Sequence, residues 1–274
     1  MDTTTDTESL RLLADSLRTT MTSVSSGAKL DEALLDLGWR EMLGEMPDAA
    51  IPLMFRLLGE TGAHAPVLND VVLTAAGDPP GGVPPLPFAG GSWVAWQRED
   101  DSGSAIDEVL PIRRVAQGDP LSPAAVNAGR QAAGWWLVGT SRAMLTLARR
   151  HAVDREQFGR RIASFQAIRH RLAETLVAIE GAEAALQVAA APADDPDGLA
   201  SLLAKAAAGR AALVTSRHCQ QVLGGIGFTA EHQLHHHVKR SLILDGLLGG
   251  TKELTRQAGK TLRTKGYAPR LAEL

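Results

Sequence analysis

The first part of the chain repeats apolar residues at helical spacing. Leu13 and Leu17 lie four positions apart, and the leucine pattern resumes after a polar stretch. Such intervals place side chains on one face of an α-helix. Gly38 and Pro47 interrupt the pattern and divide it into separate helices. We therefore predict a helical amino-terminal domain over residues 1–76.

Residues 77–121 have a different pattern, in which short apolar runs alternate with stretches rich in glycine and proline. The runs SWVAWQRE (92–99) and EVLPIRRV (108–115) have the composition of strands, and DDSGS (100–104) between them is a turn signal. This part predicts a truncated, β-rich middle segment. The number of strands that it predicts is too small for a large sheet.

Long alanine- and leucine-rich stretches fill residues 122–274. Ser122 fits an N-cap and Pro123 the first position of a helix that reaches about His151. Further helices are expected over about 165–190, 199–222, 230–245 and 251–263. Short connections favour antiparallel neighbours, so we predict a carboxyl-terminal antiparallel helical bundle domain and a mainly α fold for the whole chain.

Charge and cysteine content narrow the class of protein. The 274 residues carry a formal net charge of -3 and a pI near 6.2, whereas general nucleic-acid or membrane-surface binders usually carry a basic excess. We therefore expect no nucleic acid and no membrane among the partners. The single cysteine, Cys219, excludes an internal disulfide, and MDTTTDTESLRLL lacks the pattern of a signal peptide. A cytoplasmic location is expected.

The segment from Asp154 to Glu174 combines several arginines with a Phe–Gly pair. One interpretation is a connection between helices with a solvated charged face. The other is an anion site, in which Arg155 contacts phosphate oxygens and Phe158 offers a flat face to a ring system. The second interpretation suits a nucleotide cofactor, and the residues alone leave both open.

Residues 220–228, QQVLGGIGF, place several glycines after an expected helix. Glycine readily adopts the left-handed conformation that ends a helix, so the glycines can be a plain helix terminus. They can also let a pyrophosphate approach the backbone N–H groups. This segment therefore also admits a structural and a cofactor-binding interpretation.

With two further motifs, these segments resemble the acyl-CoA dehydrogenase family. The resemblance covers about Leu121 to Lys265, and the helical amino-terminal part is similar to that family's first domain in a less specific way. It implies the family's fold, FAD as the cofactor and an acyl-CoA thioester as the substrate. In order along the chain, the motifs are NAGR (127–130), REQFGRRIASFQ (155–166), QVLGGIGF (221–228) and KRSLILDGLLGGTKEL (239–254).

The resemblance also implies contacts at individual positions. Thr251 and Glu253 match contacts to the subunit's own FAD. The positions near the acyl-CoA are Asn127, Arg130 and Gly250, although the family more often has an aspartate where this chain has Asn127. Positions that contact the adenosine and pyrophosphate side of the neighbouring subunit's FAD are matched by Arg155, Phe158, Gln166, Gln221, Val222, Leu223, Gly224 and Gly225.

The family's catalytic base has no counterpart here. Most members place a glutamate after an aromatic residue and before Gly-Thr, and this chain has Gly249 there. Other members place it just before the arginine matched by Arg130, and this chain has Gly129. Glycine has no side chain to accept a proton. Asp245 and Glu253 lie nearby in the sequence but at neither position, so no catalytic residue is predicted.

The missing base and the short middle segment fit one another. The chain resembles one subunit of those acyl-CoA dehydrogenases that are hetero-oligomers. In these, one subunit supplies the β domain and the base, and the other subunit supplies the contacts to the adenosine side of FAD. We expect this chain to be the second kind, in an α2β2 assembly with a longer acyl-CoA dehydrogenase subunit that holds most of the FAD. The assembly would form a 2-enoyl-CoA and pass electrons to an electron-transferring flavoprotein. The alternatives are a non-catalytic acyl-CoA-binding or interaction protein, and an active homo-oligomer.

Three other groups of residues have simpler interpretations. His232 and His236 are four positions apart and could face one side of a helix, but no second ligand cluster accompanies them, so no metal site is predicted. Trp135 and Trp136 are interpreted as packing within the bundle or at an interface. Cys219 is interpreted as a small buried apolar residue.

Overall fold

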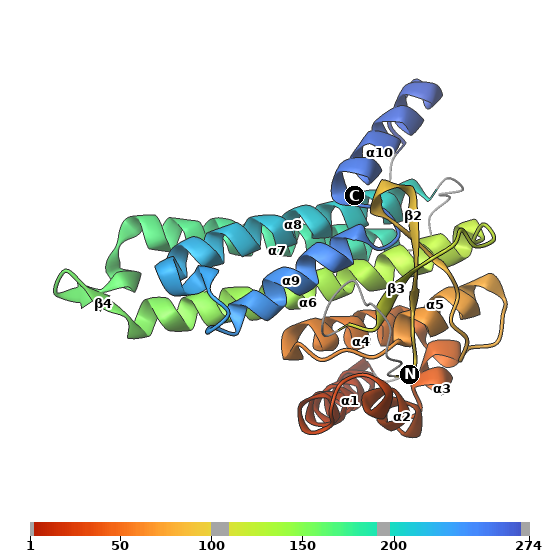
Figure 1. Ribbon diagram of the computed structural model, residues 1–274, viewed down its shortest axis with the longest axis horizontal. Coiled ribbons are helices and arrows are strands. Elements are labelled where there is room, and N and C mark those ends of the chain that lie inside the picture. The colour runs from red at the N-terminus through yellow and green to blue at the C-terminus, as the bar shows by residue number, and fades with distance from the viewer. Residues whose placement is uncertain (1–2, 100–109, 191–197, 270–274) are drawn as a thin grey trace.

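The computed structural model describes residues 3–99, 110–190 and 198–269. Helices dominate these residues, and the longest belong to the carboxyl-terminal half (Figure 1). The mainly α fold predicted above is confirmed. The turn expected at 100–104 and the first two residues of the strand expected at 108–115 lie outside the described residues.

Five helices precede the first strand. Their breaks follow the sequence pattern, because Gly38 adopts a left-handed conformation (φ 82°) just before the third helix and Pro47 is the first residue of the fourth. The predicted helical character of this part is confirmed. The helices are α1 (Thr3–Ser23), α2 (Ala28–Asp36), α3 (Trp39–Glu45), α4 (Pro47–Thr61) and α5 (Val67–Ala76).

A small antiparallel sheet follows, in the order β1-β2-β3. It consists of β1 (Leu86–Phe88), β2 (Ser92–Trp96) and β3 (Ile112–Val115), with a 3-10 turn, η1 (Ala89–Gly91), between the first two strands. The sequence did not predict β1, because prolines in and before this run are typical of non-strand segments. The sheet is as short as the middle segment predicts.

The sheet is fixed to the helices by buried contacts. The rings of Trp96 on β2 and Trp136 are stacked, with centroids 5.2 Å apart. The Asn69 side chain on α5 donates a hydrogen bond to the backbone oxygen of Trp96 at 2.8 Å. Arg98, just after β2, forms an ion pair with the fully buried Asp70. The strands therefore have a defined position against the helical part.

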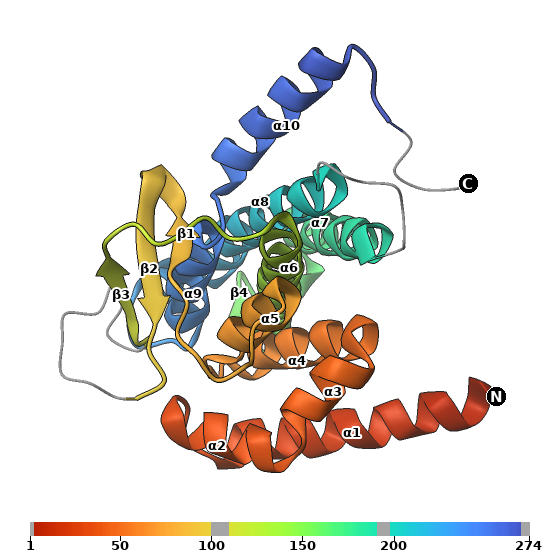
Figure 2. The ribbon, with the colours of Figure 1, turned by 90° about the vertical axis from the view of Figure 1, so that its right-hand side faces the viewer.

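The carboxyl-terminal half is an antiparallel bundle in which α6 to α9 lie side by side, while α10 projects from it (Figures 1 and 2). Ser122 accepts a hydrogen bond from the Ala125 backbone N at 3.2 Å, which confirms the predicted N-cap. None of the described helices is both long and apolar enough to cross a membrane. The helices are α6 (Pro123–Asp154), α7 (Gln166–Ala190), α8 (Leu199–Leu223), α9 (Leu234–Gly246) and α10 (Thr251–Lys265).

The backbones of α4 and α6 touch where two glycines face each other. A Cβ on Gly59 would lie 2.4 Å from the Thr140 backbone N, and a Cβ on Gly139 would lie 2.1 Å from the Arg56 backbone O. Backbone atoms cannot move aside as side chains do, so both positions require glycine. This contact holds the amino-terminal helices firmly against the bundle.

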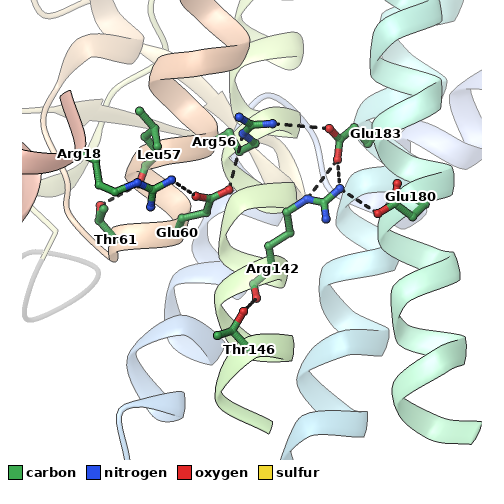
Figure 3. A network of polar contacts seen from close by, with 9 residues as sticks. All are labelled: Arg18, Arg56, Leu57, Glu60, Thr61, Arg142, Thr146, Glu180 and Glu183. Atoms are coloured by element: carbon green, nitrogen blue, oxygen red, sulfur yellow. Dashed lines mark hydrogen bonds and ion pairs between the residues drawn. The ribbon is translucent and has the colours of Figure 1, made fainter. Parts of the chain in front are cut away.

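A chain of alternating charges crosses the same junction (Figure 3). Arg18 on α1 contacts Glu60 on α4 at 2.7 Å, and Arg142 on α6 contacts Glu180 on α7 at 3.0 Å. Glu183, on α7, pairs with Arg142 as well. Partly exposed ion pairs of this kind each contribute only about 0–1 kcal/mol. The network therefore adds little to the free energy of unfolding. Its main effect is on the relative placement of α1, α4, α6 and α7.

Candidate functional site

The connection between α6 and α7 is a two-stranded hairpin with an aromatic residue at its tip. It consists of β4 (Glu156–Gln157) and β5 (Arg160–Arg161), and the two turn residues, Phe158 and Gly159, have φ values of 56° and 75°. Positive φ at both positions is the geometry of a type I′ turn, in which asparagine and glycine are favoured. Phe158 is nevertheless there, in a strained conformation, and its side chain is 90% exposed.

Other residues of the motif support this ring. Phe165 meets Phe158 edge to face, with ring centroids 6.1 Å apart, and the Arg160 guanidinium lies 4.1 Å above the Phe165 ring. Arg155 is exposed, directly after α6, and its backbone oxygen accepts a hydrogen bond from Ile162 N at 2.9 Å. Gln166 is exposed at the first position of α7. Guanidinium, amide and aromatic groups are thus available on one surface.

The glycine-rich segment after α8 lies at the same end of the bundle (Figure 1). Val222 and Leu223 are buried in a cluster against which Ile162 of the hairpin region packs. Their side chains therefore serve the core, and contacts to a ligand would come from their backbone. Gln221 is exposed.

Two glycines follow at the start of the 3-10 turn η3 (Gly224–Phe228). Gly224 has a φ of 66°, and no heavy atom of the described chain lies within 4 Å of a Cβ placed on Gly224 or Gly225. A ligand can therefore reach the backbone closely here. The Gly224 N–H itself donates to the Gln220 and Gln221 carbonyls. An arginine, an aromatic face and a backbone open to close approach are groups that can hold a phosphate and a ring.

The connection between α9 and α10 is closed by internal hydrogen bonds. The Glu253 carboxylate accepts from Gly90 N at 2.8 Å and from Gly250 N at 3.1 Å, and these bonds hold the pKa of Glu253 below its ordinary value. The Thr251 hydroxyl donates to the Asp245 carboxylate. The polar groups of Thr251 and Glu253 are therefore engaged within the chain.

Side chains of other residues crowd Gly129 and Gly249, the two positions that match the family's catalytic base. A Cβ on Gly129 would lie 2.7 Å from Leu248 Cδ1 and 3.0 Å from Val72 Cγ2. Gly249 has a φ of 105°, which L-residues rarely adopt, and a Cβ there would lie 2.7 Å from Leu254 Cδ2. A carboxylate is absent at both positions, and neighbouring side chains fill the space.

Arg130 and Asn127 face different neighbours from α6. Arg130 Nε donates to the Leu248 backbone O at 3.2 Å, and burial lowers the pKa of Arg130. Asn127 instead accepts a hydrogen bond from the Ser201 hydroxyl on α8 at 2.8 Å. It lines a cavity of about 310 Å³ between α4, α6, α7 and α8, together with Trp135. The two residues are therefore not brought together on one surface.

Lys205 on α8 is a buried cation that the sequence did not single out. Its side chain is fully buried, and Nζ donates to the backbone oxygens of Asp245 at 3.0 Å and Gly249 at 3.4 Å. Burial lowers the pKa of Lys205 to about 8. A signal was present, because Lys205 shares a helical stripe with Leu202 and Gly209.

The remaining candidates have structural surroundings. Trp135 and Trp136 are buried in the bundle, as predicted, and so is Cys219, whose pKa burial raises to about 12. The expectation that His232 and His236 share a helix is wrong, because α9 begins only at Leu234, after η3 and a turn. Within the described residues no group of three or more His, Cys, Asp or Glu is arranged to hold a metal ion.

Comparison with known proteins decides the family. Residues 117–260 match the model of the acyl-CoA dehydrogenase carboxyl-terminal domain, which is more than half of the chain. The chain belongs to the acyl-CoA dehydrogenase family. The residues matched include both the hairpin motif and the α9–α10 connection described above.

Individual acyl-CoA dehydrogenases agree with this assignment. Acyl-CoA dehydrogenase FadE34 of Mycobacterium tuberculosis is 36% identical over 197 residues, which are 66% of this chain and 28% of that protein. The chain thus spans less than a third of that relative's length. The ChsE4-ChsE5 complex from Mycobacterium tuberculosis has a similar fold, with a TM-score of 0.68 at 20% identity over 96% of this chain and 98% of the other.

A second similar structure contains a reduced flavin. A glutaryl-CoA dehydrogenase from Mycobacterium smegmatis in complex with FADH2 has a TM-score of 0.68 at 15% identity, over 98% of this chain and 97% of the other. Identities this low show the fold alone. The acyl-CoA dehydrogenase fold expected from the sequence is confirmed.

Proposed function

We propose that this chain is one subunit of a heteromeric, FAD-dependent acyl-CoA dehydrogenase whose catalytic base lies on a longer partner subunit. The assembly removes hydrogen from the α and β carbons of an acyl-CoA thioester and forms a 2-enoyl-CoA. In this reaction a base takes the α-proton, and bound FAD accepts the β-hydride. The present chain contributes binding contacts and no proton acceptor.

The observation that carries the proposal is the packing around Gly129 and Gly249. A glycine alone would mean only that a carboxylate is missing. Here Leu248 and Leu254 also occupy the space into which a side chain would extend. Proton abstraction requires a base within hydrogen-bond reach of its target, and this chain has no base at either position and a leucine side chain close to each. The base must then come from another chain.

The opposite end of the bundle supports a contribution to a neighbour's cofactor. Arg155 would contact the pyrophosphate of a neighbouring subunit's FAD, Phe158 would present its ring to the adenosine side, and Gln166 would donate from its amide. The segment Gln221–Gly225 would let the cofactor approach the backbone at Gly224 and Gly225, where no heavy atom of the described chain lies within 4 Å of a Cβ position. Arg155, Phe158 and Gln166 are exposed in the chain alone, as a surface that completes another protein's site requires.

The subunit's own cofactor contacts are a different case. Thr251 and Glu253 direct their polar groups to Asp245, Gly90 and Gly250. The small sheet, with strands of three to five residues, covers little surface. We infer that this chain does not enclose a flavin of its own.

Further features of the proposal concern the assembly. We propose an α2β2 arrangement in the cytoplasm, an electron-transferring flavoprotein as the acceptor, and a division of this chain into residues 1–76, 77–121 and 122–274. Asn127, matched to a position near the acyl-CoA, accepts a hydrogen bond from Ser201, and the Gly250 N–H donates to the Glu253 carboxylate. The thioester would therefore lie in the partner's site.

Co-expression with a longer acyl-CoA dehydrogenase subunit tests the proposal. We expect this chain alone to be colourless and the purified complex to show flavin absorbance, with the mass of a mixed tetramer. Arg155→Ala lowers the flavin retained by the complex at least tenfold. Arg263→Ala removes an exposed arginine from α10 and serves as the matched control, with no loss of flavin.

Two results would contradict the proposal. Flavin bound at one per chain by this protein alone would favour an active homo-oligomer. If a complex forms and Arg155→Ala leaves its flavin content unchanged, the hairpin surface does not contribute to flavin binding. If no complex forms and no flavin is bound, the non-catalytic acyl-CoA-binding or interaction protein becomes the better description.

A further inference from the structure

A groove of about 500 Å³ lies beside the charge network of Figure 3. Residues of α1, α4, α6, α7 and α9 line it. Among the described lining residues three are arginines and one is a glutamate, and an amide and an imidazole add neutral polar groups. The proposed function uses none of these side chains, which are Arg18, Glu60, Arg142, Arg149, Gln233 and His237.

Carboxylates hold two of the arginines in fixed orientations. Arg18 donates from Nη2 to Glu60 at 2.7 Å. Arg142 donates from Nε to Glu183 at 3.1 Å and from Nη2 to Glu180 at 3.0 Å. In the described part of the chain, Nη1 of neither guanidinium has a partner. A guanidinium carries five N–H donors in a planar fork, so both arginines keep donors for a further acceptor.

The third arginine, Arg149, pairs with no residue that the structure describes. It follows Arg142 by seven residues on α6, which places both on one face of the helix, about 10.5 Å apart along its axis. The next residue, Arg150, does not line the groove and pairs with Asp154 at 3.7 Å. The exposed Arg149 guanidinium is therefore available to a ligand in the groove.

The groove keeps a positive charge when the surrounding network is counted. Arg56, Glu180 and Glu183 belong to that network without lining the groove. With them included, four arginines meet three glutamates, and the charge in excess is that of Arg149. A bound anion would balance this charge.

His237 on α9 adds a neutral polar group to the lining. Its ring lies against the end of α4, where a Cβ on Gly62 would be 3.4 Å from Cε1. Burial lowers the pKa of His237 to about 4, and Arg240 and His236 contribute in the same direction. The imidazole is therefore neutral near neutral pH and carries one N–H donor.

We propose that this groove binds a small organic phosphate, whose phosphate group lies between Arg18, Arg142 and Arg149. Arginine forks match phosphate oxygens, and such charge-assisted hydrogen bonds are about twice as strong as neutral ones. A phosphate monoester has three terminal oxygens, one for each arginine, whereas a carboxylate has two. Leu147 and Leu176 line the groove as well and provide apolar contact for the organic part.

Calorimetric titration of the full chain with phenyl phosphate, a probe of this class, tests the groove. We expect saturable binding of one phenyl phosphate per chain, and at least tenfold weaker binding by Arg149→Ala. Arg150→Ala is the matched control, since it removes the adjacent arginine from the same helix and leaves the affinity at the wild-type value. Arg18→Ala provides a second variant from another helix and should also weaken binding.

Three results would overturn the proposal. The first is a wild-type chain that shows no saturable binding. The second is an equal loss of affinity in Arg149→Ala and Arg150→Ala, which would indicate a general attraction to basic surface. The third is equal affinity for benzoate, which would contradict the assignment of a phosphate. Nuclear magnetic resonance locates the ligand independently, because the ring signals of His237 should shift with phenyl phosphate and should not shift in Arg149→Ala at the same concentration.

The groove and the proposed function are tested on different residues. Neither the hairpin surface nor the α9–α10 connection lines the groove. If Arg155→Ala abolishes phenyl phosphate binding and Arg149→Ala does not, the phosphate lies at the hairpin and the groove proposal is rejected. If no flavin-containing complex forms but Arg149→Ala weakens phenyl phosphate binding, the groove proposal stands without the heteromeric enzyme.

Discussion

Phe158 and Leu248 have nearly the same unusual backbone and opposite surroundings. Their φ values are 56° and 58°, and among the described residues they are the two non-glycine residues with positive φ. Phe158 is 90% exposed at one end of the bundle, whereas Leu248 is 2% exposed near the start of α10. The same backbone conformation thus occurs with an exposed side chain at one position and with a buried side chain at the other.

The proposed function interprets this difference as one ligand surface that is kept and one that is lost. At the hairpin, the backbone near Phe158, Gly224 and Gly225 is open. At the α9–α10 connection, every family position expected to contact FAD or thioester is packed, hydrogen-bonded or both. Strained residues collect at functional positions. In this chain one of them is exposed and the other is buried in the core.

The α9–α10 connection (residues 247–250) is called the closed end below. Restoring a carboxylate there has the largest expected effect. Gly249→Glu places an L-residue at a φ of 105° and a Cβ 2.7 Å from Leu254 Cδ2. We expect the free energy of unfolding to fall by roughly 2–5 kcal/mol, from left-handed strain and overpacking together. Urea denaturation measures this change.

The hairpin of residues 156–161, called the open end below, provides the control for this variant. Gly159 also has a positive φ, 75°, but no heavy atom of the described chain lies within 4 Å of its Cβ position. Gly159→Glu should therefore cost only the strain, about 1–2 kcal/mol. Equal losses in the two variants would mean that the closed end is no more tightly packed than the hairpin.

Lys205 gives the closed end a dependence on pH. Its pKa is about 8 in the folded chain, against 10.5 ordinarily. Between these values the unfolded chain binds more protons than the folded one, so this group makes stability rise with pH, by at most roughly 3 kcal/mol. Lys205→Met should flatten the rise between pH 8 and 10 in urea denaturation series.

The exposed Lys252 on α10 provides the comparison. Lys252→Met leaves the slope of stability against pH as in the wild type. A wild-type chain whose stability does not rise above pH 8 would show that Lys205 is not held as a buried cation. A rise that survives Lys205→Met would assign it to another group.

The sequence predicted the helices well and the packing of the α9–α10 connection poorly. Helical spacing and the Ser122–Pro123 start located the long helices to within about four residues, and the motif from Arg155 to Gln166 marked the connection between two of them. These signals are local in the chain. The role of Leu248 is not local, because it depends on Val72, Gly129 and Pro87, which only the tertiary fold brings near.

Lys205 illustrates the same limit. Lysine within an alanine-rich helix predicts a solvated side chain, and here the carbonyls of Asp245 and Gly249 bury it instead. Gly209, one turn later, is equally ambiguous in the sequence. A Cβ there would lie 2.1 Å from the Asp245 carboxylate, so glycine is required for the approach of the α9–α10 connection.

The smallest expected effect compares the two strained residues directly. Phe158→Asn introduces the residue that a type I′ turn favours before glycine, and we expect it to raise the free energy of unfolding by about 0.5–1 kcal/mol. Leu248→Asn relieves the same strain but removes a buried side chain, so we expect a net loss of about 1–3 kcal/mol. Urea denaturation measures both, and the Phe158→Asn chain is then co-expressed with the longer subunit. If Phe158→Asn is more stable but its complex retains less flavin, the strain at Phe158 is kept for binding. If the free energy of unfolding shifts in the same direction in both variants, burial does not distinguish the two residues.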